Sequence, residues 1–285
     1  MAIKTVGVIG CGVMGSGIAQ VSAQAGLRTV VVEVNQELLQ RGIGNIKKNL
    51  EGLVAKGRLS APDRDAVLDR ITGAARFEDL EACDLVVEAI TENQQVKNET
   101  FGKLDRICQP QAILASNTSS CNVTAMAAAT KRPGRVVGLH FFNPVPLMKL
   151  VEVVRTILTE EVTFTTAWEW IRAVGKTPVA VKDSTGFIVN RLLVPYLLEA
   201  IRLLESGGAS MEDIDQAMKL GCGYPMGPFT LLDLLGLDTA MYVAEVMFEE
   251  FREARFAPPP LLKRMVLAGQ LGRKSGRGFY DYTQR

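Results

Sequence analysis

The sequence predicts an α/β fold with a doubly wound, mostly parallel sheet, followed by an all-α C-terminal domain. In the first part of the chain, short apolar runs rich in Val, Ile and Leu alternate with stretches of helical length. Such continuous apolar runs are typical of strands that helices cover on both faces. After residue 184 no strand-like run follows, and helical stretches separated by Gly and Pro turns continue. We therefore predict two domains, at residues 1–184 and 185–285.

The strands of the first domain are predicted from its apolar runs. They cover residues 4–9, 29–33, 84–89, 113–116, 136–139 and 150–154, with a further candidate at 179–181. Between them, helices are predicted at residues 14–25, 36–56, 94–107 and 163–174. Alternation of strand and helix is the pattern of a parallel sheet with helical crossovers.

The second domain begins where the composition changes, at Asp183, Ser184 and Thr185. These residue types favour helix starts because their side chains accept hydrogen bonds from the first free N–H groups. Helices are predicted at residues 187–205, 211–220, 229–235, 238–253 and 261–268. Turn signals separate them, including the sequence GCGYP and three consecutive prolines.

Composition excludes several classes of function. Charges nearly cancel, with 32 Lys and Arg against 31 Asp and Glu, so the chain has no general attraction to nucleic acid or to an anionic membrane. No apolar run reaches the roughly 18 residues that a membrane span requires. The first residues show no signal or transit pattern. We expect a cytoplasmic protein with no nucleic-acid or membrane partner.

Cysteine and histidine content argues against a metal site. The five cysteines include no C-x-x-C pair and the chain has one histidine, so we expect no zinc ligand set and no bound metal. An odd number of scattered cysteines suits a reducing compartment. We interpret each cysteine as a small, buried apolar residue.

A glycine motif lies near the N-terminus, in the sequence VIGCGVMGSGIAQ. Gly10, Gly12 and Gly15 form G-x-G-x-x-G between a predicted strand and a predicted helix. The first glycine permits a tight turn, the second lets the backbone approach a pyrophosphate, and the third lets helix and strand pack closely. The helix N-terminus, with Val13 and Met14, offers N–H groups and a positive dipole end to phosphates. The motif indicates a dinucleotide site of the Rossmann type; the alternative is a glycine-rich turn without a ligand.

Glu33 indicates which dinucleotide is bound. It ends the second predicted strand, about 20 residues after the glycine motif, where a carboxylate accepts hydrogen bonds from the adenosine ribose hydroxyls. The same carboxylate repels a 2′-phosphate, and the next residues, Val34, Asn35 and Gln36, supply no cation. The pattern favours NAD over NADP, unless Glu33 is only a solvated charge at a strand end.

His140 is the candidate general acid/base. A single histidine is more often structural, but this one ends an apolar strand, and the carboxyl ends of parallel strands are where such sheets bind ligands. An unperturbed imidazole pKa of about 6.5 suits the proton transfer that accompanies hydride transfer from a hydroxyl-bearing carbon. Glu152 lies in the next strand and would orient the imidazole if the two strands are neighbours; by sequence alone it is equally a surface charge.

Two further polar positions are candidates for substrate contacts. The sequence ASNTSS ends another apolar strand, and Asn117, Ser119 and Ser120 within it would donate hydrogen bonds to a substrate oxygen or cap the next helix. Asn190 lies in an otherwise apolar helix, where its amide requires a partner, either a ligand or buried backbone.

With these residues identified, the chain resembles the 3-hydroxyacyl-CoA dehydrogenase family, most of all its short-chain bacterial members, which act on 3-hydroxybutyryl-CoA. The resemblance covers almost the whole chain. It runs through VIGCGVMGSGIAQ, LVVEAITEN, ASNTSS, GLHFFNPVPLMKLVEVV, DSTGFIVNRLLVPYLLEA, AMKLGCGYPMGPFTLLDLLGLD and GRKSGRGFYDY. It implies NAD-dependent, reversible oxidation of an (S)-3-hydroxyacyl-CoA to the 3-ketoacyl-CoA, a helical second domain that helps to form the substrate site, and a homodimer or higher homo-oligomer.

The resemblance also implies roles for individual residues. His140 matches the general acid/base and Glu152 the carboxylate that orients it. Ser119 and Asn190 match residues that contact the 3-oxygen and the reacting region of the substrate, and these four form the catalytic set.

The cofactor and CoA contacts come from the same resemblance. Glu92, Lys97 and Asn117 match residues at the nicotinamide end of the cofactor site, and Glu33 matches the acidic residue at the adenine ribose. Lys56 matches a basic residue that helps to hold CoA, although a solvated lysine at a helix end has the same appearance.

Two other functions fit part of the pattern. The first is a dehydrogenase of a free hydroxy acid or sugar acid, which an assay with a CoA-free 3-hydroxy acid separates from a CoA-dependent enzyme. The second is a non-catalytic dinucleotide-binding structural or sensor protein that keeps the fold and lacks the chemistry, since function resides in the site rather than in the fold.

Overall fold

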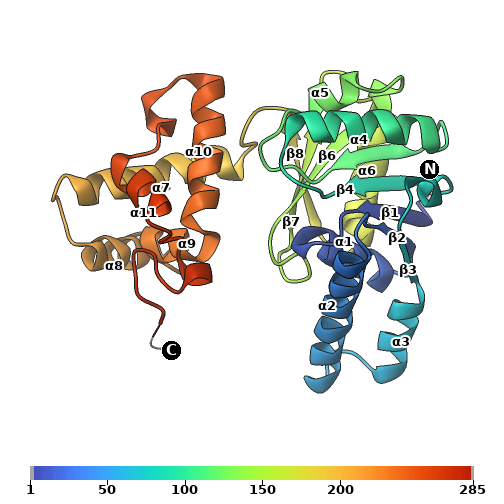
Figure 1. Ribbon diagram of the computed structural model, residues 1–285, viewed down its shortest axis with the longest axis horizontal. Helices are drawn as coiled ribbons and strands as arrows, with labels where there is room; N and C mark the ends of the chain where they lie inside the picture. Colours follow the sequence, from blue (N-terminus) through green and yellow to red (C-terminus); the bar gives the residue numbers. More distant parts are fainter. Residues whose placement is uncertain (1–2, 284–285) are drawn as a thin grey trace. The chain divides into compact units, whose positions relative to one another are not determined.

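The computed structural model describes residues 3–283. The chain divides after Ser184 into two compact units (Figure 1). The first unit contains all eight named strands of the described residues, and in the second unit these residues form helices joined by short turns.

The first unit is built on one eight-stranded sheet in the order β3-β2-β1-β4-β5-β6-β7-β8. Strands β1 to β6 are parallel to one another, β7 is antiparallel to β6, and β8 is parallel to β7. The mostly parallel sheet predicted from the apolar runs is therefore confirmed. The strands are β1 (Thr5–Ile9), β2 (Arg28–Val32), β3 (Ile71–Ala74), β4 (Leu85–Glu88), β5 (Ile113–Ser116), β6 (Val136–Phe141), β7 (Leu150–Arg155) and β8 (Thr177–Lys182).

Helices cover both faces of this sheet, and the side chains of its central strands are therefore buried on both faces. Every residue of β1, β4, β5 and β6 is buried, and alternate strand residues share one core with α1 and α6. α2 and α3 lie side by side and extend from the sheet (Figure 1). The helices are α1 (Val13–Gln24), α2 (Gln36–Ala55), α3 (Ala61–Asp69), α4 (Gln94–Ile107), α5 (Val123–Ala128) and α6 (Glu161–Ala173).

Strand β3 and helix α3 of the first unit were not predicted, and helix α5 was expected only as the helix that follows ASNTSS, without bounds. Strand β3 has the sequence ITGA and lies at the edge of the sheet, with no fully buried residue to give an apolar signal. Helix α3 has a single buried residue, Val67, so it lacks an apolar stripe. Helix α5 is only six residues long. β3 and α3 therefore bury too little apolar surface to mark them in the sequence, and α5 is too short to show a helical period.

The second unit packs its helices around its own apolar core. The core includes Leu198, Phe229 and Met247, each of which has 0% of its surface exposed. The chain then ends in an irregular segment that follows the last helix. The helices are α7 (Val189–Glu205), α8 (Met211–Cys222), α9 (Pro228–Leu235), α10 (Leu237–Phe251) and α11 (Pro260–Leu267).

Helix α7 starts two residues later than predicted. Gly186 and Phe187 have φ angles of 81° and 49°, which a right-handed helix does not accommodate. The expectation that Asp183 starts this helix is also wrong. Its carboxylate accepts hydrogen bonds from the backbone N–H of Thr124 and from the Thr124 hydroxyl, both at 2.6 Å, and so holds the start of α5.

Candidate active site

The glycine loop has the geometry that a dinucleotide requires. Gly10 has φ 91°, in the region that favours glycine. A Cβ built on Gly15 would lie 1.9 Å from the carbonyl oxygen of Gly10, whereas a Cβ on Gly12 would meet no heavy atom within 4 Å. Gly15 therefore serves close packing inside the protein, and Gly12 faces open space that suits the approach of a pyrophosphate. Val13 begins α1 beside this space and is 69% exposed.

Glu33 follows β2 and its side chain turns toward the glycine loop. Its Oε2 accepts a hydrogen bond from the backbone N–H of Cys11 at 3.1 Å. This bond orients the carboxylate beside the loop, so Glu33 is not simply a solvated strand-end charge. Val34 follows with 75% of its surface exposed, and Asn35 accepts from the backbone N–H of Leu38 to begin α2.

His140 and Glu152 face each other across the one antiparallel pair of the sheet. The β6–β7 register places the two residues directly opposite, and Nδ1 of His140 lies 2.6 Å from Oε2 of Glu152. The exposed fraction is 7% for His140 and 0% for Glu152, so the alternative that Glu152 is a surface charge is wrong. Strand β6 extends to Phe141, beyond the predicted end at residue 139, and this extension brings His140 into the ladder.

The polar loop after β5 lies beside His140. Oδ1 of Asn117 accepts from the backbone N–H of Phe141 at 3.0 Å, which ties the start of the loop to the strand that carries His140. Helix capping is performed by Asn122, whose side chain accepts from the backbone N–H of Ala125. Ser119 and Ser120 are therefore not the caps of α5.

Glu92 holds this loop from the β4 side. One of its oxygens, Oε1, lies within hydrogen-bonding distance of the backbone N–H groups of Ser119 and Ser120, at 2.8 and 3.0 Å. The hydroxyls of Thr118, Ser119 and Ser120 also lie 2.5, 3.2 and 3.1 Å from the same atom. A carboxylate oxygen offers about two lone pairs, so five donors exceed its capacity. The hydroxyls of Ser119 and Ser120 make the two longest of these contacts, so either can turn to another acceptor.

A buried ion-pair network lies beneath Glu92. Nζ of Lys97 is 2.7 Å from Oε1 of Glu88 and 3.2 Å from Oε2 of Glu92. Burial by itself raises the pKa of Glu92, but the Lys97 ammonium and the hydrogen bonds from Thr118 and Ser119 hold it below its usual range. Burial likewise disfavours the Lys97 ammonium, and the two carboxylates nevertheless raise its pKa above the ordinary value. Glu92 and Lys97 are therefore both charged at neutral pH.

Sequence reasoning missed Glu88 and Lys176. Glu88 ends an otherwise apolar strand that is buried on both faces, and a charge in such a strand is the signal that a buried partner exists. Lys176 donates from Nζ to the backbone carbonyls of Val145 and Met148, at 2.5 and 2.8 Å, and burial lowers its pKa. It fixes the segment between β6 and β7, which has no local sequence signal.

One predicted site residue of the first unit, Lys56, is not part of this cluster. Lys56 is exposed and caps the C-terminal end of α2, a helix of 20 residues and hence roughly 30 Å long. Asn190 is half-buried in the first turn of α7, in the second unit. Its position near a helix start removes the argument that a fully buried amide needs a ligand, and its proposed role rests on the family pattern.

Four of the five cysteines are buried as expected, and Cys222 is not. Burial raises the pKa of Cys11, Cys108 and Cys121 to about 11 and that of Cys83 to about 12, so these thiols stay protonated near neutrality. Cys222 ends α8 and is exposed, which corrects the expectation that it is buried. The apolar stripe of α8 does not reach this last residue.

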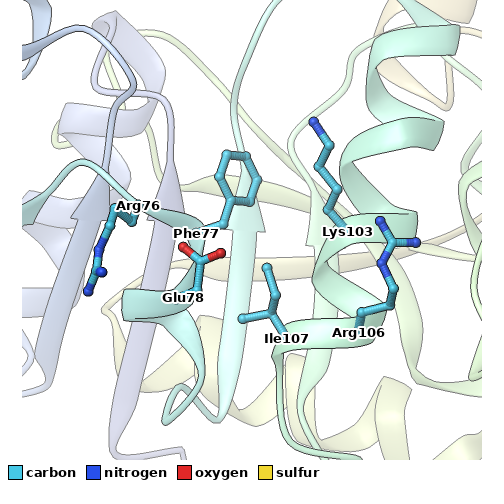
Figure 2. Close-up of a pocket in the computed structure, with 6 residues that line it drawn as sticks. All are labelled: Arg76, Phe77, Glu78, Lys103, Arg106 and Ile107. Atoms are coloured by element: carbon cyan, nitrogen blue, oxygen red, sulfur yellow. The ribbon is translucent and has the colours of Figure 1, made fainter.

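A separate cavity of about 440 Å³ lies where the second half of α4 meets the short 3₁₀ turn η1 (Phe77–Leu80) (Figure 2). Its walls carry three cationic side chains, and Nζ of Lys103 lies 5.9 Å from the centre of the Phe77 ring. It contains none of the predicted site residues and no imidazole. The lining residues are Arg76, Phe77, Glu78, Lys103, Arg106 and Ile107.

Most of the candidate cofactor-binding and catalytic residues of the first unit therefore lie at one edge of the sheet. Strands β1, β2, β4, β5 and β6 run parallel, and their carboxyl ends carry the glycine loop, Glu33, Glu88, the loop of residues 117–120 and His140. This edge of a doubly wound sheet is where such folds bind ligands. Within residues 3–283, no helix is both long enough and apolar enough to cross a membrane.

Comparison with known proteins gives a consistent result. The family model described as the NAD-binding domain of 3-hydroxyacyl-CoA dehydrogenase matches residues 5–184, and the model of the C-terminal domain matches residues 186–282. A 3-hydroxybutyryl-CoA dehydrogenase of Mycobacterium tuberculosis is 52% identical over 283 residues, with 99% of each chain covered. The human mitochondrial hydroxyacyl-coenzyme A dehydrogenase is 48% identical, covering 98% of this chain and 91% of that protein. The crystal structure of (S)-3-hydroxybutyryl-CoA dehydrogenase from Ralstonia eutropha has a TM-score of 0.96 at 44% identity, covering 99% of this chain and 100% of that chain.

Proposed function

The chain belongs to the 3-hydroxyacyl-CoA dehydrogenase family, and we propose that it interconverts (S)-3-hydroxybutyryl-CoA and acetoacetyl-CoA with His140 as general acid/base. It is an NAD-dependent oxidoreductase. The observation that carries the residue assignment is the buried pair of His140 and Glu152, 2.6 Å apart, at the edge of the sheet that also carries the glycine loop.

The His140–Glu152 contact selects the atom that exchanges the proton. Because a carboxylate only accepts hydrogen bonds, its closeness to Nδ1 places the imidazole proton there and makes Nε2 the ring nitrogen that exchanges a proton with the substrate hydroxyl. Glu152 also stabilises the imidazolium that forms when Nε2 takes the proton. When bound, NAD accepts the hydride in the oxidation and NADH returns it in the reduction.

The remaining residues bind and orient. The glycine loop receives the pyrophosphate, with Gly12 giving the backbone close approach, and Glu33 accepts from the adenosine ribose hydroxyls. Asn117, Glu92 and Lys97 form the nicotinamide end, with Lys97 acting through Glu92 because its ammonium is already held by two carboxylates. Ser119 and Asn190 contact the substrate oxygen and the reacting region, and Lys56 holds part of CoA.

The assay that tests this function follows NADH absorbance with acetoacetyl-CoA as the substrate. We expect saturable NADH oxidation with acetoacetyl-CoA and at least about 100-fold lower kcat/KM with free acetoacetate, because remote binding energy from the CoA moiety supports catalysis. Longer 3-ketoacyl-CoA substrates, measured in the same way, define chain-length preference. Equal kcat/KM with free acetoacetate would assign the protein to the free hydroxy acids, and no turnover of either compound would leave a dinucleotide-binding protein without this chemistry.

Cofactor preference is tested in the same assay. Glu33 lies where a 2′-phosphate would meet a carboxylate, so NADPH should have a kcat/KM at least about 10-fold below that of NADH. The variant Glu33→Gln removes the charge and keeps the shape of the side chain. It should reduce the ratio of kcat/KM with NADH to kcat/KM with NADPH. Comparable values for the two cofactors in the unaltered enzyme would contradict the role given to Glu33.

We also propose that the protein is a cytoplasmic homo-oligomer. The second unit exposes large apolar side chains, including Leu192 at 71%, Leu220 at 75% and Leu267 at 87%, and we expect such a surface to be covered by a second copy in a homodimer or larger oligomer. Five cysteines without a disulfide suit the reducing cytoplasm. Light scattering of the purified protein measures the oligomeric state directly.

A further inference from the structure

Glu88 has no role in the mechanism above, yet it is as completely buried as Glu152. It is the last residue of β4 and has 0% of its surface exposed. Its Oε1 accepts hydrogen bonds from the backbone N–H of Ile90 at 2.8 Å and from Nζ of Lys97 at 2.7 Å. Its Oε2 accepts from the hydroxyl of Ser116 at 2.7 Å. Both oxygens are therefore fixed by donors from three different segments.

Two routes lead from Glu88 to the loop that carries Ser119. In the first, the Lys97 ammonium bridges Glu88 to Glu92, and Glu92 accepts from the backbone N–H of Ser119. In the second, the Ser116 hydroxyl that donates to Glu88 accepts from the backbone N–H of Thr118 at 3.2 Å. The loop is thus held at two successive residues by contacts that originate at one carboxylate.

We propose that Glu88 is a positioning residue for the reaction: it anchors Lys97 and Ser116 beneath the carboxyl edge of the sheet and thereby fixes the loop that presents Ser119. This inference rests on the proposed function, in which the Ser119 hydroxyl contacts the substrate oxygen. A buried ion pair of this kind adds little net stability compared with packed apolar side chains, because desolvation offsets the attraction. What it supplies is a fixed direction for each donor, and small displacements of a group at the reacting atoms reduce turnover strongly.

The first test replaces the charge and keeps the shape. Glu88→Gln retains one side-chain oxygen and leaves Glu92 as the only carboxylate that pairs with Lys97. The positions of Lys97 and Ser116, and through them the position of the loop that carries Ser119, are then less tightly fixed. We expect kcat with acetoacetyl-CoA to fall by roughly 10- to 100-fold, with a smaller change in the KM for the substrate. The matched control is Asp105→Asn, on the same helix as Lys97, which weakens the ion pair with Arg132 at 2.7 Å. It should lower the thermal unfolding midpoint without lowering the kcat of the folded enzyme.

Coupling to Ser119 separates positioning from a general loss of stability. If Glu88 acts through the loop, Glu88→Gln should have at most a 2-fold effect on kcat in a Ser119→Ala background, because the hydroxyl it positions is absent. An equal loss of kcat in both backgrounds would overturn the proposal. So would a Glu88→Gln enzyme that has a lowered unfolding midpoint and wild-type kcat. Wild-type activity is measured first: an inactive wild type counts against the proposed function, whereas an active wild type with an unaffected variant counts against Glu88 only.

Two more variants keep the test decisive if Glu88→Gln does not fold. Ser116→Ala removes only the second route, and it should lower kcat less than the charge change and show the same non-additivity with Ser119→Ala. Full additivity there would overturn the proposal. Lys97→Met removes the ammonium that faces Glu92. The other groups near Glu92 include the hydroxyls of the loop and the protonated Cys121 thiol, and the Glu88 carboxylate is linked to Glu92 only through the same ammonium.

The Lys97 variant has a readout that does not depend on activity. The pKa of Glu92 is lowered in the folded protein, so its contribution to stability is present above its ordinary pKa and is lost as the pH falls through the folded value. Without the ammonium the folded pKa rises, and acid unfolding of the cofactor-free protein should begin at a higher pH in Lys97→Met than in wild type. Unchanged acid unfolding would show that Lys97 does not hold Glu92 and would break the first route.

Discussion

Each unit of the molecule buries two carboxylates: Glu88 and Glu152 in the first, Asp215 and Asp233 in the second. In the first unit each one faces a nitrogen that carries or can acquire positive charge, the ammonium of Lys97 or the imidazole of His140. In the second unit, within the described residues, neither aspartate has a Lys or Arg nitrogen within 4.0 Å, and both are met by N–H and O–H donors. All four carboxylates are buried, but the two pairs are stabilised in different ways.

Asp215 joins two parts of the second unit. It accepts from the backbone N–H of Phe229 and of Thr230, at 2.8 and 3.0 Å, and from the Thr230 hydroxyl at 2.6 Å. It also accepts from the hydroxyl of Tyr280 at 3.0 Å. The carboxylate thus accepts hydrogen bonds from the first turn of α9 and at the same time binds the segment that follows the last helix.

Asp233 binds that final segment a second time. It accepts from the backbone N–H groups of Phe279 and Tyr280, at 2.9 and 2.8 Å, and from the hydroxyl of Tyr282 at 3.1 Å. Burial raises the pKa of Asp233 in spite of these donors. A Cβ on Gly278 would lie 2.0 Å from Oδ1 of Asp233, so the glycine is needed for close approach.

The groups around a buried acid determine what that acid does. A carboxylate beside a titratable or cationic nitrogen changes the proton affinity of its partner and so acts on chemistry. A carboxylate surrounded by amide and hydroxyl donors is an acceptor that holds chain segments together. We therefore expect changes in the first unit to appear mainly in kcat and changes in the second to appear mainly in thermal stability.

The largest effect should come from removing the imidazole. His140→Ala should lower kcat by about 10⁴-fold, the upper range for general acid/base catalysis, and leave the affinity for NADH nearly unchanged. His140→Asn is the matched variant. Its amide can still donate a hydrogen bond to Glu152, so the buried Glu152 carboxylate keeps a partner. Both variants should be inactive, and the Asn variant should unfold closer to the wild-type temperature. Near-normal turnover in either would exclude His140 as the acid/base.

Removing the charge of Glu152 should have the next largest effect. Glu152→Gln should lower kcat by about 10²- to 10³-fold, because the amide neither fixes the Nδ1 proton nor stabilises the imidazolium. The KM for acetoacetyl-CoA should change much less, since Glu152 acts through the base. A raised KM with an unchanged kcat, in steady-state measurements, would show that Glu152 serves binding instead.

In the second unit the expected effect is on unfolding. Asp233→Asn should destabilise the protein by about 2–3 kcal/mol, because it loses charge-assisted hydrogen bonds and turns an amide donor toward the backbone N–H of Tyr280. The unfolding midpoint in calorimetry should fall and kcat should stay within about 2-fold of wild type. The control is Asp281→Asn, an exposed carboxylate in the same segment, which should leave the midpoint almost unchanged. A loss of kcat in Asp233→Asn at temperatures where it is folded would break the comparison.

The smallest effect is expected from a single hydroxyl. Tyr282→Phe removes one of the donors to Asp233 and should cost about 0.5–1.5 kcal/mol. Chemical denaturation measures this difference. If the cost equals that of Asp233→Asn, the tyrosine rather than the carboxylate carries the attachment of the segment.

The sequence predicts some of these features and not others, for physical reasons. Apolar runs and the glycine motif mark the parallel strands because burial on both faces leaves a strong local pattern. His140 and Glu152 were identified, but their pairing depends on the reversal of β7, which no local pattern encodes. Glu88 and Lys97 meet through packing of α4 on the sheet, and Asp233 meets Tyr280 across a long stretch of chain. Contacts of this kind depend on tertiary structure, so residue type alone does not reveal them.

The antiparallel ladder between β6 and β7 has a consequence for redesign. The pairing of His140 with Glu152 is fixed by strand register, so a change of length in the connection at residues 142–149 leaves the two residues opposite each other as long as the ladder is kept. One residue inserted inside β7 ahead of Glu152 would instead turn its carboxylate to the opposite face of the sheet. Redesign of this part of the sheet should therefore keep the length of the strand constant.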